Sequence, residues 1–253
     1  MPKLNLKLVN KYQIAPKVYF LTFLSNTKTQ YIPGQFFSLE VETKNFRPYS
    51  VCYVSNKAPH FFPHTKSLPD LDEGEYISFM ISTKPGGTAS QYFENVQTDT
   101  EINAIGPSGR FGLHINDKPK VFIATGTGLA PFLPMIHETL EKNSLATIDL
   151  FFGCWKYTDN FAPKFFVDVT DHTKYPNLRI FTVAEDLENQ QETQTLLGGR
   201  VTTVIPNIIK DFIQTDFYLC GHPAMVTDMG AVLVSNGGIE GENVFMEKFG
   251  TMK

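Results

Sequence analysis

The sequence predicts two domains in series: a small antiparallel β-barrel, followed by an α/β domain built on a parallel sheet. Up to about Asn116, short runs of β-branched and aromatic residues are separated by turn sequences, and helical periodicity is almost absent. After Asn116, apolar runs alternate with helix-like segments, which is typical of crossover connections in a parallel sheet covered on both faces. We therefore expect a boundary between residues 116 and 119, with domains at 1–116 and 117–253.

The barrel strands are expected where apolar side chains alternate or cluster between turn signals. Leu4, Leu6 and Leu8 alternate with polar residues, as in a strand with one buried face. The other strand candidates are residues 18–23, 35–41, 50–54 and 76–82. Turn signals include Gly106-Pro107-Ser108-Gly109, and residues 59–72 are expected to form an exposed loop between two strands.

In the second domain, runs of strand length alternate with segments whose apolar residues repeat at helical spacing. The strand candidates are residues 121–124, 147–152, 179–183 and 217–220, with a last strand at 244–249, and the helix candidates are residues 131–141, 161–168, 201–210 and 223–235. Ligands of such sheets bind at the carboxyl ends of the strands. We therefore expect residues 126–128, 153–155, 184–186 and 220–223 to lie along one edge.

Composition excludes several classes of function. The chain has 253 residues, 42% of them hydrophobic, which is enough for a sizeable core. Its formal net charge of −4 and the lack of a dense run of Lys or Arg argue against a nucleic-acid-binding surface. No apolar stretch approaches the roughly 20 residues of a membrane span. The N-terminal sequence has no signal-peptide pattern, so we expect a cytoplasmic protein.

The sequence predicts no metal centre. Cys52, Cys154 and Cys220 lie far apart and cannot supply the four thiolates of an iron-sulfur cluster on their own. The prolines beside His60 and His64 argue against the shared helical face that a metal-binding pair would need. Any iron-sulfur partner would therefore be a separate protein.

The sequence around Gly126 predicts a nucleotide-binding site. A buried strand, residues 121–124, runs into Gly126-Thr127-Gly128, and Pro131 then suits the first position of a helix. At such a junction, backbone N–H groups and the positive end of the helix dipole attract a phosphate. A P-loop is disfavoured because no Lys-Ser/Thr pair follows the second glycine, and Pro131 replaces the third glycine of the full dinucleotide fingerprint. These residues alone leave a pyrophosphate site and an ordinary tight turn both open.

Two sequences in the barrel half would suit a flavin dinucleotide. Arg47-Pro48-Tyr49-Ser50 joins a loop to a strand and combines a cation for the pyrophosphate, an aromatic ring for stacking and a hydroxyl for a ring nitrogen. A surface arginine before an ordinary strand is the alternative. Gly86-Gly87, followed by a helical turn at Thr88-Ala89-Ser90, forms a second candidate anion site.

Taken in order, these motifs resemble those of the ferredoxin-NADP reductase superfamily. Arg47-Pro48-Tyr49-Ser50 matches its flavin motif, residues 86–90 are similar to the flavin-phosphate loop of its NADH-cytochrome reductase branch, and residues 106–109 resemble the turn that closes the barrel. Residues 126–131 resemble the nicotinamide pyrophosphate loop, and residues 220–225 resemble the element near the nicotinamide. The resemblance implies a six-stranded FAD-binding barrel, an NAD(P)-binding α/β domain, and hydride transfer from nicotinamide to flavin.

The resemblance also implies roles for single residues. Ser50 would contact the flavin reaction centre, Tyr49 would stack on the ring, and Cys220 would lie near the nicotinamide carbon that gives up hydride. Ser50 and Cys220 are thus the candidate catalytic residues. Phe249 is the candidate for an aromatic residue against the flavin, with a plain core role as the alternative. The expected cofactor-binding residues are Arg47, Pro48, Tyr49, Ser50, Gly86, Gly87, Thr88, Ala89, Ser90, Thr125, Gly126, Thr127, Gly128, Cys154, Trp155, Arg200, Cys220, Gly221, Pro223, Met225 and Phe249.

The sequence favours NADH over NADPH. The NADPH-using branch tends to carry arginines for the 2′-phosphate after the second and third strands of the nucleotide domain, where this chain has Trp155 and Glu185. Two lost charged contacts of roughly 1.5 to 3 kcal/mol each would weaken phosphate binding by about a hundredfold or more. Glu185 would add repulsion, whereas Lys156 and Arg200 are arguments for NADPH.

We expect a flavoprotein reductase that passes electrons from NAD(P)H through FAD to a separate acceptor, such as a ferredoxin, a flavodoxin or an oxygenase component. The acceptor is separate because this sequence contains no cysteine cluster for a fused iron-sulfur domain. A non-catalytic nucleotide-binding subunit that has lost its flavin is the alternative. We expect a monomer, and the sequence leaves the physiological acceptor open.

Overall fold

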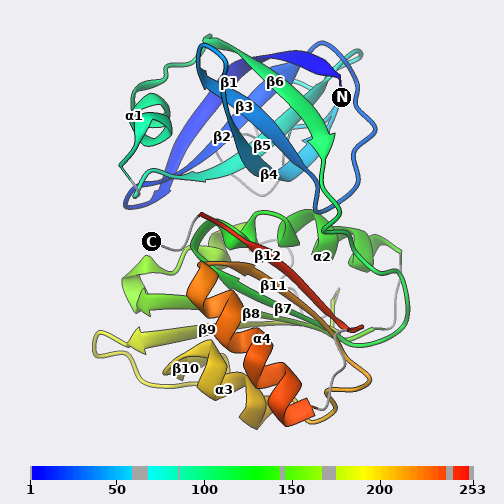
Figure 1. The fold of residues 1–253 in the computed structure, drawn as a ribbon, viewed down its shortest axis with the longest axis vertical. Helices are drawn as coiled ribbons and strands as arrows, with labels where there is room; N and C mark the ends of the chain where they lie inside the picture. Colours follow the sequence, from blue (N-terminus) through cyan, green and yellow to red (C-terminus); the bar gives the residue numbers. More distant parts are fainter. Residues whose placement is uncertain are drawn as a thin grey trace. The chain divides into compact units, whose positions relative to one another are not determined.

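The computed structural model describes residues 2–58, 68–84, 86–142, 146–166, 175–237 and 242–250. The chain divides into two compact units (Figure 1): unit 1 consists of residues 1–113 and 130–135, and unit 2 of residues 114–129 and 136–253. Most of the loop expected at 59–72, including His60 and His64, lies outside the described residues.

Unit 1 is a closed barrel of six strands in the order β1-β2-β5-β4-β3-β6. In chain order it contains β1 (Lys3–Ala15), β2 (Val18–Ser25), β3 (Phe36–Glu42), β4 (Asn45–Ser55), β5 (Glu75–Ser82), helix α1 (Thr88–Asn95) and β6 (Glu101–Ser108). Every neighbouring pair of strands is antiparallel. The prediction of a six-stranded antiparallel barrel is therefore confirmed.

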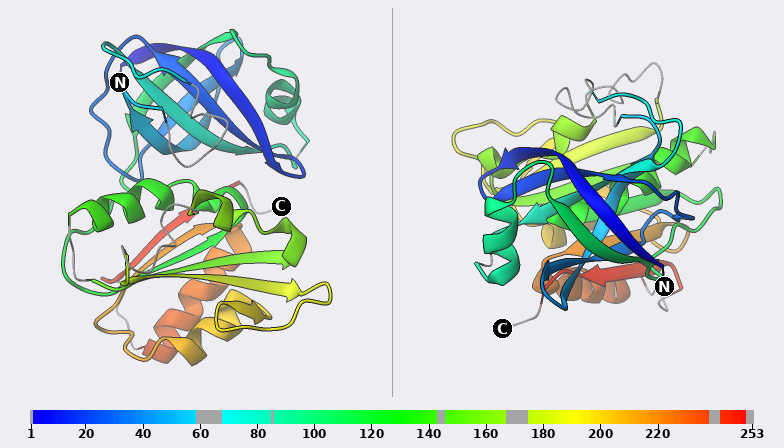
Figure 2. Two further views of the ribbon diagram at one scale, coloured as in Figure 1. Left: turned by 180° about the vertical axis from the view of Figure 1, so that it is seen from behind. Right: turned by 90° about the horizontal axis from the view of Figure 1, so that it is seen from above.

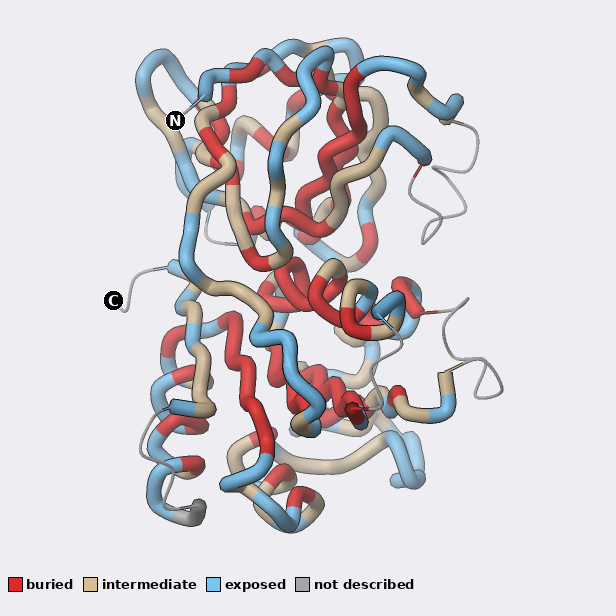
Figure 3. Tube along the Cα trace, turned by 90° about the vertical axis from the view of Figure 1, so that its right-hand side faces the viewer, coloured by how far each residue is buried: buried red, intermediate tan, exposed pale blue. Residues whose placement is uncertain are grey.

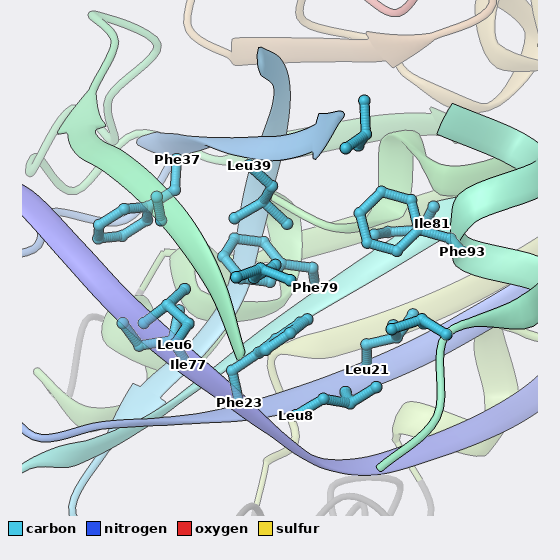
Figure 4. Packing of buried hydrophobic residues seen from close by; sticks show 14 of the residues in the cluster. Leu6, Leu8, Leu21, Phe23, Phe37, Leu39, Ile77, Phe79, Ile81 and Phe93 are labelled. Carbon is cyan, nitrogen blue, oxygen red and sulfur yellow. The ribbon is translucent and has the colours of Figure 1, made fainter. Parts of the chain in front are cut away.

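Inward-facing side chains fill the barrel. Leu6 and Leu8 on β1 are fully buried and pack in one cluster with Phe23, Phe37 and Phe79 (Figure 4). The ring of Phe79 makes edge-to-face contacts with Phe23 and Phe37, at centroid distances of 5.9 and 6.2 Å. Burying each such side chain stabilises the fold by about 1.5 to 3 kcal/mol. A slip of one residue would turn these side chains outward, so the core fixes the register of the strands.

Two barrel strands differ from the expected ones. Gly106-Pro107-Ser108 forms the end of β6 rather than a turn, and Gly109 follows with φ +113°. This strand gives a weak hydrophobic pattern because two of its buried positions carry only Ala104 and Gly106. β4 begins at Asn45, so residues 47–50 lie within a strand rather than at a loop junction. The connection from β3 spans only two residues, which leaves no room for a loop.

Unit 2 is built on a six-stranded sheet in the order β10-β9-β8-β7-β11-β12 (Figures 1 and 2). After β6 the chain forms β7 (Lys120–Thr125), the 3-10 helix η2 (Gly126–Leu129), α2 (Phe132–Glu141), β8 (Ile148–Lys156), the 3-10 helices η3 (Tyr157–Asp159) and η4 (Ala162–Phe165), β9 (Leu178–Asp186), β10 (Leu196–Gly198), α3 (Val201–Ile208), β11 (Asp216–Gly221), α4 (Pro223–Gly237) and β12 (Val244–Lys248). All neighbouring strands are parallel, which confirms the predicted α/β fold.

Helices α3 and α4 pack on each other and on the sheet. Val201 and Ile205 of α3 form one buried cluster with Val226 and Met229 of α4 and with apolar residues of β7, β8, β9 and β11. Figure 3 shows the central strands as continuous buried stretches, whereas α4 alternates between buried and exposed positions. That alternation is typical of an amphipathic surface helix. No helix that the structure describes is long and apolar enough to cross a membrane.

Three details of unit 2 differ from expectation. The helix expected at 161–168 is the short 3-10 helix η4 in the part that the structure describes, with Phe161 and Phe165 buried and Pro163 inside the turn. The helix expected from Pro131 begins at Phe132, after a 3-10 turn over the glycines. The three-residue strand β10 was not expected, because so short a strand has no detectable period.

The amino-terminal edge of the sheet contains a buried ion pair. Lys120 at the start of β7 and Asp216 at the start of β11 are 1% and 2% exposed, and Nζ lies 3.4 Å from Oδ2. Asn116 bridges them: its Nδ2 donates to Asp216 at 2.9 Å, and its Oδ1 accepts from Lys120 at 2.8 Å. Two residues earlier, the backbone N–H of His114 donates to the Tyr218 hydroxyl at 2.9 Å. These bonds attach the first residues of unit 2 to its own sheet.

Candidate functional site

The motif expected to hold the flavin lies on β4 in unit 1. Arg47 is exposed, and its guanidinium donates to the backbone oxygen of Phe46 at 3.0 Å. Pro48 is also exposed, whereas Tyr49 is half-buried and Ser50 is buried. Burial raises the pKa of the Tyr49 phenol to about 12, so its ring is neutral at pH 7. The strand thus presents a cation and a neutral aromatic ring within three residues.

Gly86 and Gly87 lie just before α1 and have open space around them. A Cβ atom at either glycine would meet no heavy atom within 4 Å, so a ligand can approach the backbone closely. Gly86 adopts φ +73°, and its N–H donates to Ser90 Oγ at 3.1 Å. Within the described part of the chain, no side chain caps the start of α1 at Gly87. Thr88 is exposed and Ala89 half-buried beside this turn. The turn therefore fits a phosphate held by backbone N–H groups.

Helix α1 joins these two motifs. Phe93 of α1 is fully buried in the barrel core, and its ring meets the Tyr49 ring edge-to-face at a centroid distance of 5.2 Å. The glycine turn and the flavin motif are therefore neighbours of one helix in unit 1. This arrangement suits a ligand with a ring system and a phosphate group, as in FAD.

In unit 2, the glycine turn after β7 packs against the end of β11. A Cβ atom at Gly128 would lie 2.2 Å from the Cys220 backbone oxygen, and one at Gly221 would lie 2.5 Å from a backbone oxygen of β7. Gly126 is different, because a Cβ there would meet nothing within 4 Å, and its φ is +54°. Thr127 between the two glycines is half-buried. Gly126 thus borders space that suits a phosphate, whereas Gly128 allows two strand ends to meet.

Cys220 is the second-last residue of β11, and its side chain is fully buried. Burial raises the pKa of its thiol well above the usual value, and the nearby Glu247 carboxylate, with Oε2 3.9 Å from Sγ, raises it further. The thiol is therefore protonated at neutral pH and is not a nucleophile. Phe249 is half-buried, and its backbone N–H donates to the Gly221 oxygen at 2.9 Å. The Phe249 backbone is thus bonded to the residue that follows Cys220.

Side chains also join the ends of β7 and β11. Thr125 Oγ1 accepts a hydrogen bond from the backbone N–H of His222 at 3.0 Å. Pro223 is buried at the start of α4, and Met225 is half-buried against the helix and sheet cluster of unit 2. Thr125 therefore lies at the strand end with the glycines, whereas Met225 contributes to core packing.

The end of β8 carries Cys154 and Trp155. Cys154 is half-buried with Sγ 3.9 Å from the Val183 backbone oxygen, and burial raises its pKa to about 12. Trp155 is 60% exposed, although a tryptophan side chain is on average mostly buried in a folded protein. An exposed aromatic ring at the ligand edge of a parallel sheet suits stacking on a base or a ring.

Two ion pairs lie at the same edge. Arg200, which precedes α3, donates from Nε to the Glu185 carboxylate at 2.9 Å, so the arginine expected to attract a 2′-phosphate is already paired with a carboxylate. Lys156 Nζ lies 3.7 Å from the Glu188 carboxylate. Glu188 also accepts from the backbone N–H of Thr158 at 2.8 Å. Sequence reasoning identified Lys156, Arg200 and Glu185 but not the pairing of Arg200 with Glu185 or of Lys156 with Glu188.

The strand order brings the unit 2 candidates to one edge. β9, β8, β7 and β11 are neighbours and parallel, so their carboxyl ends lie side by side. Glu247 was not predicted as a neighbour of Cys220. β12 pairs with β11 so that Glu247 lies opposite Cys220, and no local sequence pattern reveals that pairing. No group of three or more metal-ligating side chains occurs among the described residues.

Comparison with known proteins identifies both units. Residues 5–113 match the oxidoreductase FAD-binding domain, and residues 122–230 match the oxidoreductase NAD-binding domain. The chain therefore combines the two nucleotide-binding domains of a flavin-dependent oxidoreductase. It belongs to the ferredoxin-NADP reductase superfamily. The predicted cofactors, FAD and NAD(P)H, are confirmed at this level.

Two of the similar proteins are named as components of dioxygenase systems. The chain is 30% identical over 223 residues to the ferredoxin--NAD(P)(+) reductase component of the naphthalene 1,2-dioxygenase system of Pseudomonas putida, covering 87% of this chain and 61% of the relative. It is 29% identical over 230 residues to the 2-halobenzoate 1,2-dioxygenase electron transfer component of Burkholderia cepacia, covering 88% and 60%. The chain thus spans about three-fifths of the length of these relatives.

Solved structures share the fold. The cytochrome P450 reductase GcoB of Amycolatopsis has a TM-score of 0.81 at 21% identity, covering 98% of this chain and 70% of that chain. The FAD/NAD-binding domain of nitric oxide dioxygenase from Vibrio cholerae has a TM-score of 0.77 at 18% identity, covering 98% of this chain and 99% of that chain. At these identities, the likeness establishes the shared architecture of both units.

Proposed function

We propose that the protein is a flavoprotein reductase that takes hydride from NADH onto FAD and passes electrons to a separate acceptor protein. The observation that carries this proposal is a pair of open glycine turns, at Gly86-Gly87 in the FAD-binding unit and at Gly126 in the NAD-binding unit. We infer functional domains at residues 1–116 and 117–253, near the division between the two compact units.

The protein residues would bind and orient the two cofactors. Arg47 and the backbone at the start of α1 would hold the FAD pyrophosphate, Tyr49 would cover the flavin ring, and Ser50 would bond a ring nitrogen. The bound flavin supplies the chemistry, which is acceptance of a hydride and release of electrons. Cys220 would act by shape rather than as a nucleophile, because its buried thiol is protonated.

NADH is the proposed donor because Arg200 is paired with Glu185. A 2′-phosphate bound to Arg200 would have to displace the Glu185 carboxylate or lie beside it. The negative charges of the phosphate and the carboxylate would then repel each other. A ribose 2′-hydroxyl instead donates to a carboxylate. Replacing Glu185 with Gln removes the repulsion and frees Arg200, so we expect it to raise the efficiency of NADPH about tenfold or more relative to NADH.

The acceptor is proposed from the relatives, whose names describe reductase and electron transfer components of oxygenase systems. We propose a ferredoxin or an oxygenase component as the acceptor and a monomeric reductase. The competing proposal is a nucleotide-binding subunit that has lost its flavin. Purified protein that is yellow and bleaches with NADH supports the reductase, whereas colourless protein that binds nucleotide without reducing a dye supports the competitor.

Stopped-flow flavin reduction with NADH and NADPH tests the proposal. We expect NADH to reduce the flavin faster and the Glu185→Gln variant to narrow the difference. The matched control is Glu188→Gln, which alters another carboxylate at this edge but leaves the Arg200 pair intact. Equal rates with both nucleotides in the unaltered protein would refute the preference for NADH.

A further inference from the structure

The carboxyl end of α1 is held by a lysine from the barrel wall. Lys11 on β1 donates from Nζ to the Glu94 backbone oxygen at 2.7 Å and to the Val96 backbone oxygen at 3.2 Å. The Lys11 ammonium also lies 5.0 Å from the centre of the Tyr19 ring. The last carbonyls of a helix have no partner within it, and a cation there also complements the helix dipole. Lys11 therefore satisfies the end of α1 opposite to the glycine turn.

The side chain of Glu94 forms a second attachment at this end. Its carboxylate pairs with Lys17 Nζ and accepts from Thr83 Oγ1 at 2.9 Å. Thr83 is buried, and its backbone N–H donates to the Lys17 backbone oxygen at 2.8 Å. The hydrogen bond from Lys17 is the main cause of the lowered pKa of Glu94. The group is thus ionised at neutral pH and remains an acceptor.

These bonds connect the residue before the glycine turn to the last turn of α1. Thr83 immediately precedes the turn, and its backbone oxygen accepts from the Gly86 N–H at 3.3 Å. Glu94 lies in the last turn of α1, about 9 Å along the helix axis from its first residue. The Thr83–Glu94 hydrogen bond therefore joins the two ends of the segment that carries Gly86, Gly87 and Ser90.

We propose that Glu94, held by Lys17 and Thr83, is a positioning residue that sets the start of α1 for the pyrophosphate of FAD. The inference rests on the proposed binding of that pyrophosphate at Gly86 and Gly87. Glu94 lies at the far end of the helix, so it acts through the helix and not by touching the phosphate. The neighbouring residue Phe93 anchors α1 in the core independently. Loss of Glu94 should therefore loosen the turn without unfolding the barrel.

The test compares FAD with riboflavin, which has the flavin ring but no phosphate. Apoprotein carrying Glu94→Ala is titrated with each compound, and Kd is measured by flavin fluorescence. We expect FAD to bind about tenfold more weakly, because a dipole-oriented phosphate contact is disturbed, with riboflavin affinity and Tm nearly unchanged. Lys17→Met, which removes an exposed partner, should give a smaller loss of the same kind, and Glu94→Gln should partly restore FAD binding.

Two further variants separate the possible failures. Asp99→Asn breaks the exposed Lys7–Asp99 pair on the same barrel, leaves the bonds of Glu94 to Lys17 and Thr83 in place, and should leave both affinities unchanged. Gly87→Asp places a negative charge in the open turn. If Gly87→Asp leaves FAD affinity intact, the proposed phosphate site is wrong. If Gly87→Asp abolishes FAD binding while Glu94→Ala changes nothing, or weakens FAD and riboflavin equally, only the positioning role is refuted.

Discussion

Two glycines in one turn, Gly126 and Gly128, should respond differently to the same substitution. A Cβ atom at Gly128 would lie 2.2 Å from the Cys220 backbone oxygen and 2.6 Å from the Gly221 Cα. Neither atom belongs to a flexible side chain, so the ends of β7 and β11 must separate. A Cβ atom at Gly126 meets nothing within 4 Å, so the penalty there is only conformational.

The expected magnitudes follow from these geometries. Overpacking a rigid site costs typically 1 to 3 kcal/mol, and an overlap of about 1 Å with backbone belongs at or above the upper end, so we expect about 3 kcal/mol or more for Gly128→Ala. Gly126 has φ +54°, where a residue with Cβ costs roughly 1 to 2 kcal/mol. The new methyl group would also project into the space proposed for a phosphate, so nucleotide binding should weaken.

Urea unfolding followed by circular dichroism and titration with NADH measure the two effects separately. Gly128→Ala should lower the free energy of unfolding more than Gly126→Ala does. Relative to its loss of stability, Gly126→Ala should weaken NADH binding more than Gly128→Ala does. If the two variants were equally stable, the packing role assigned to Gly128 would be refuted. If Gly126→Ala bound NADH normally, the open turn would not be the phosphate site.

Three other substitutions test buried polar groups of the two units, including Glu75 at the start of β5. Asp216→Ala leaves the buried Lys120 cation unpaired and should cost about 3 to 5 kcal/mol in urea unfolding, much of which Lys120→Met should restore in the double variant. Burial raises the pKa of Glu75, so its ionisation opposes folding and the penalty grows as pH rises above the unfolded pKa; Glu75→Gln should therefore raise Tm at pH 7 and have little effect near pH 4. Tyr218→Phe removes the acceptor of the His114 N–H and should cost about 1 kcal/mol in the same unfolding assay, with an unchanged midpoint as the contrary result.

The architecture could be predicted from the sequence because the spacing of apolar residues differs clearly between the two halves of the chain. Strands with a full apolar face, such as β5 and β7, were predicted within about two residues at each end. β6 was not predicted as a strand, because the small residues Ala104 and Gly106 occupy two of its buried positions and weaken its hydrophobic pattern. β10 is too short to have a period, and its pairing with β9 arises only in the folded sheet.

The candidate sites were predicted as local motifs, and their partners were not. Strand order decides that Glu247 lies beside Cys220 and that Glu185 meets Arg200, and no local pattern encodes strand order. The roles of the two glycines in the turn after β7 were also beyond sequence reasoning, since both precede a helix and only the packing of β11 distinguishes them. Which residues touch the cofactors remains a prediction.

The hairpin between β3 and β4 limits how the flavin motif can evolve. Phe37 lies opposite Tyr49 and Leu39 opposite Arg47, across a connection of only two residues. If a length change there shifted the pairing of β3 and β4 by one residue, each motif residue would face the opposite side of the strand, since side chains alternate. Substitutions at the tip of the hairpin should therefore be accepted, and a laboratory library of loop lengths should yield yellow protein only where the register of β3 and β4 is kept.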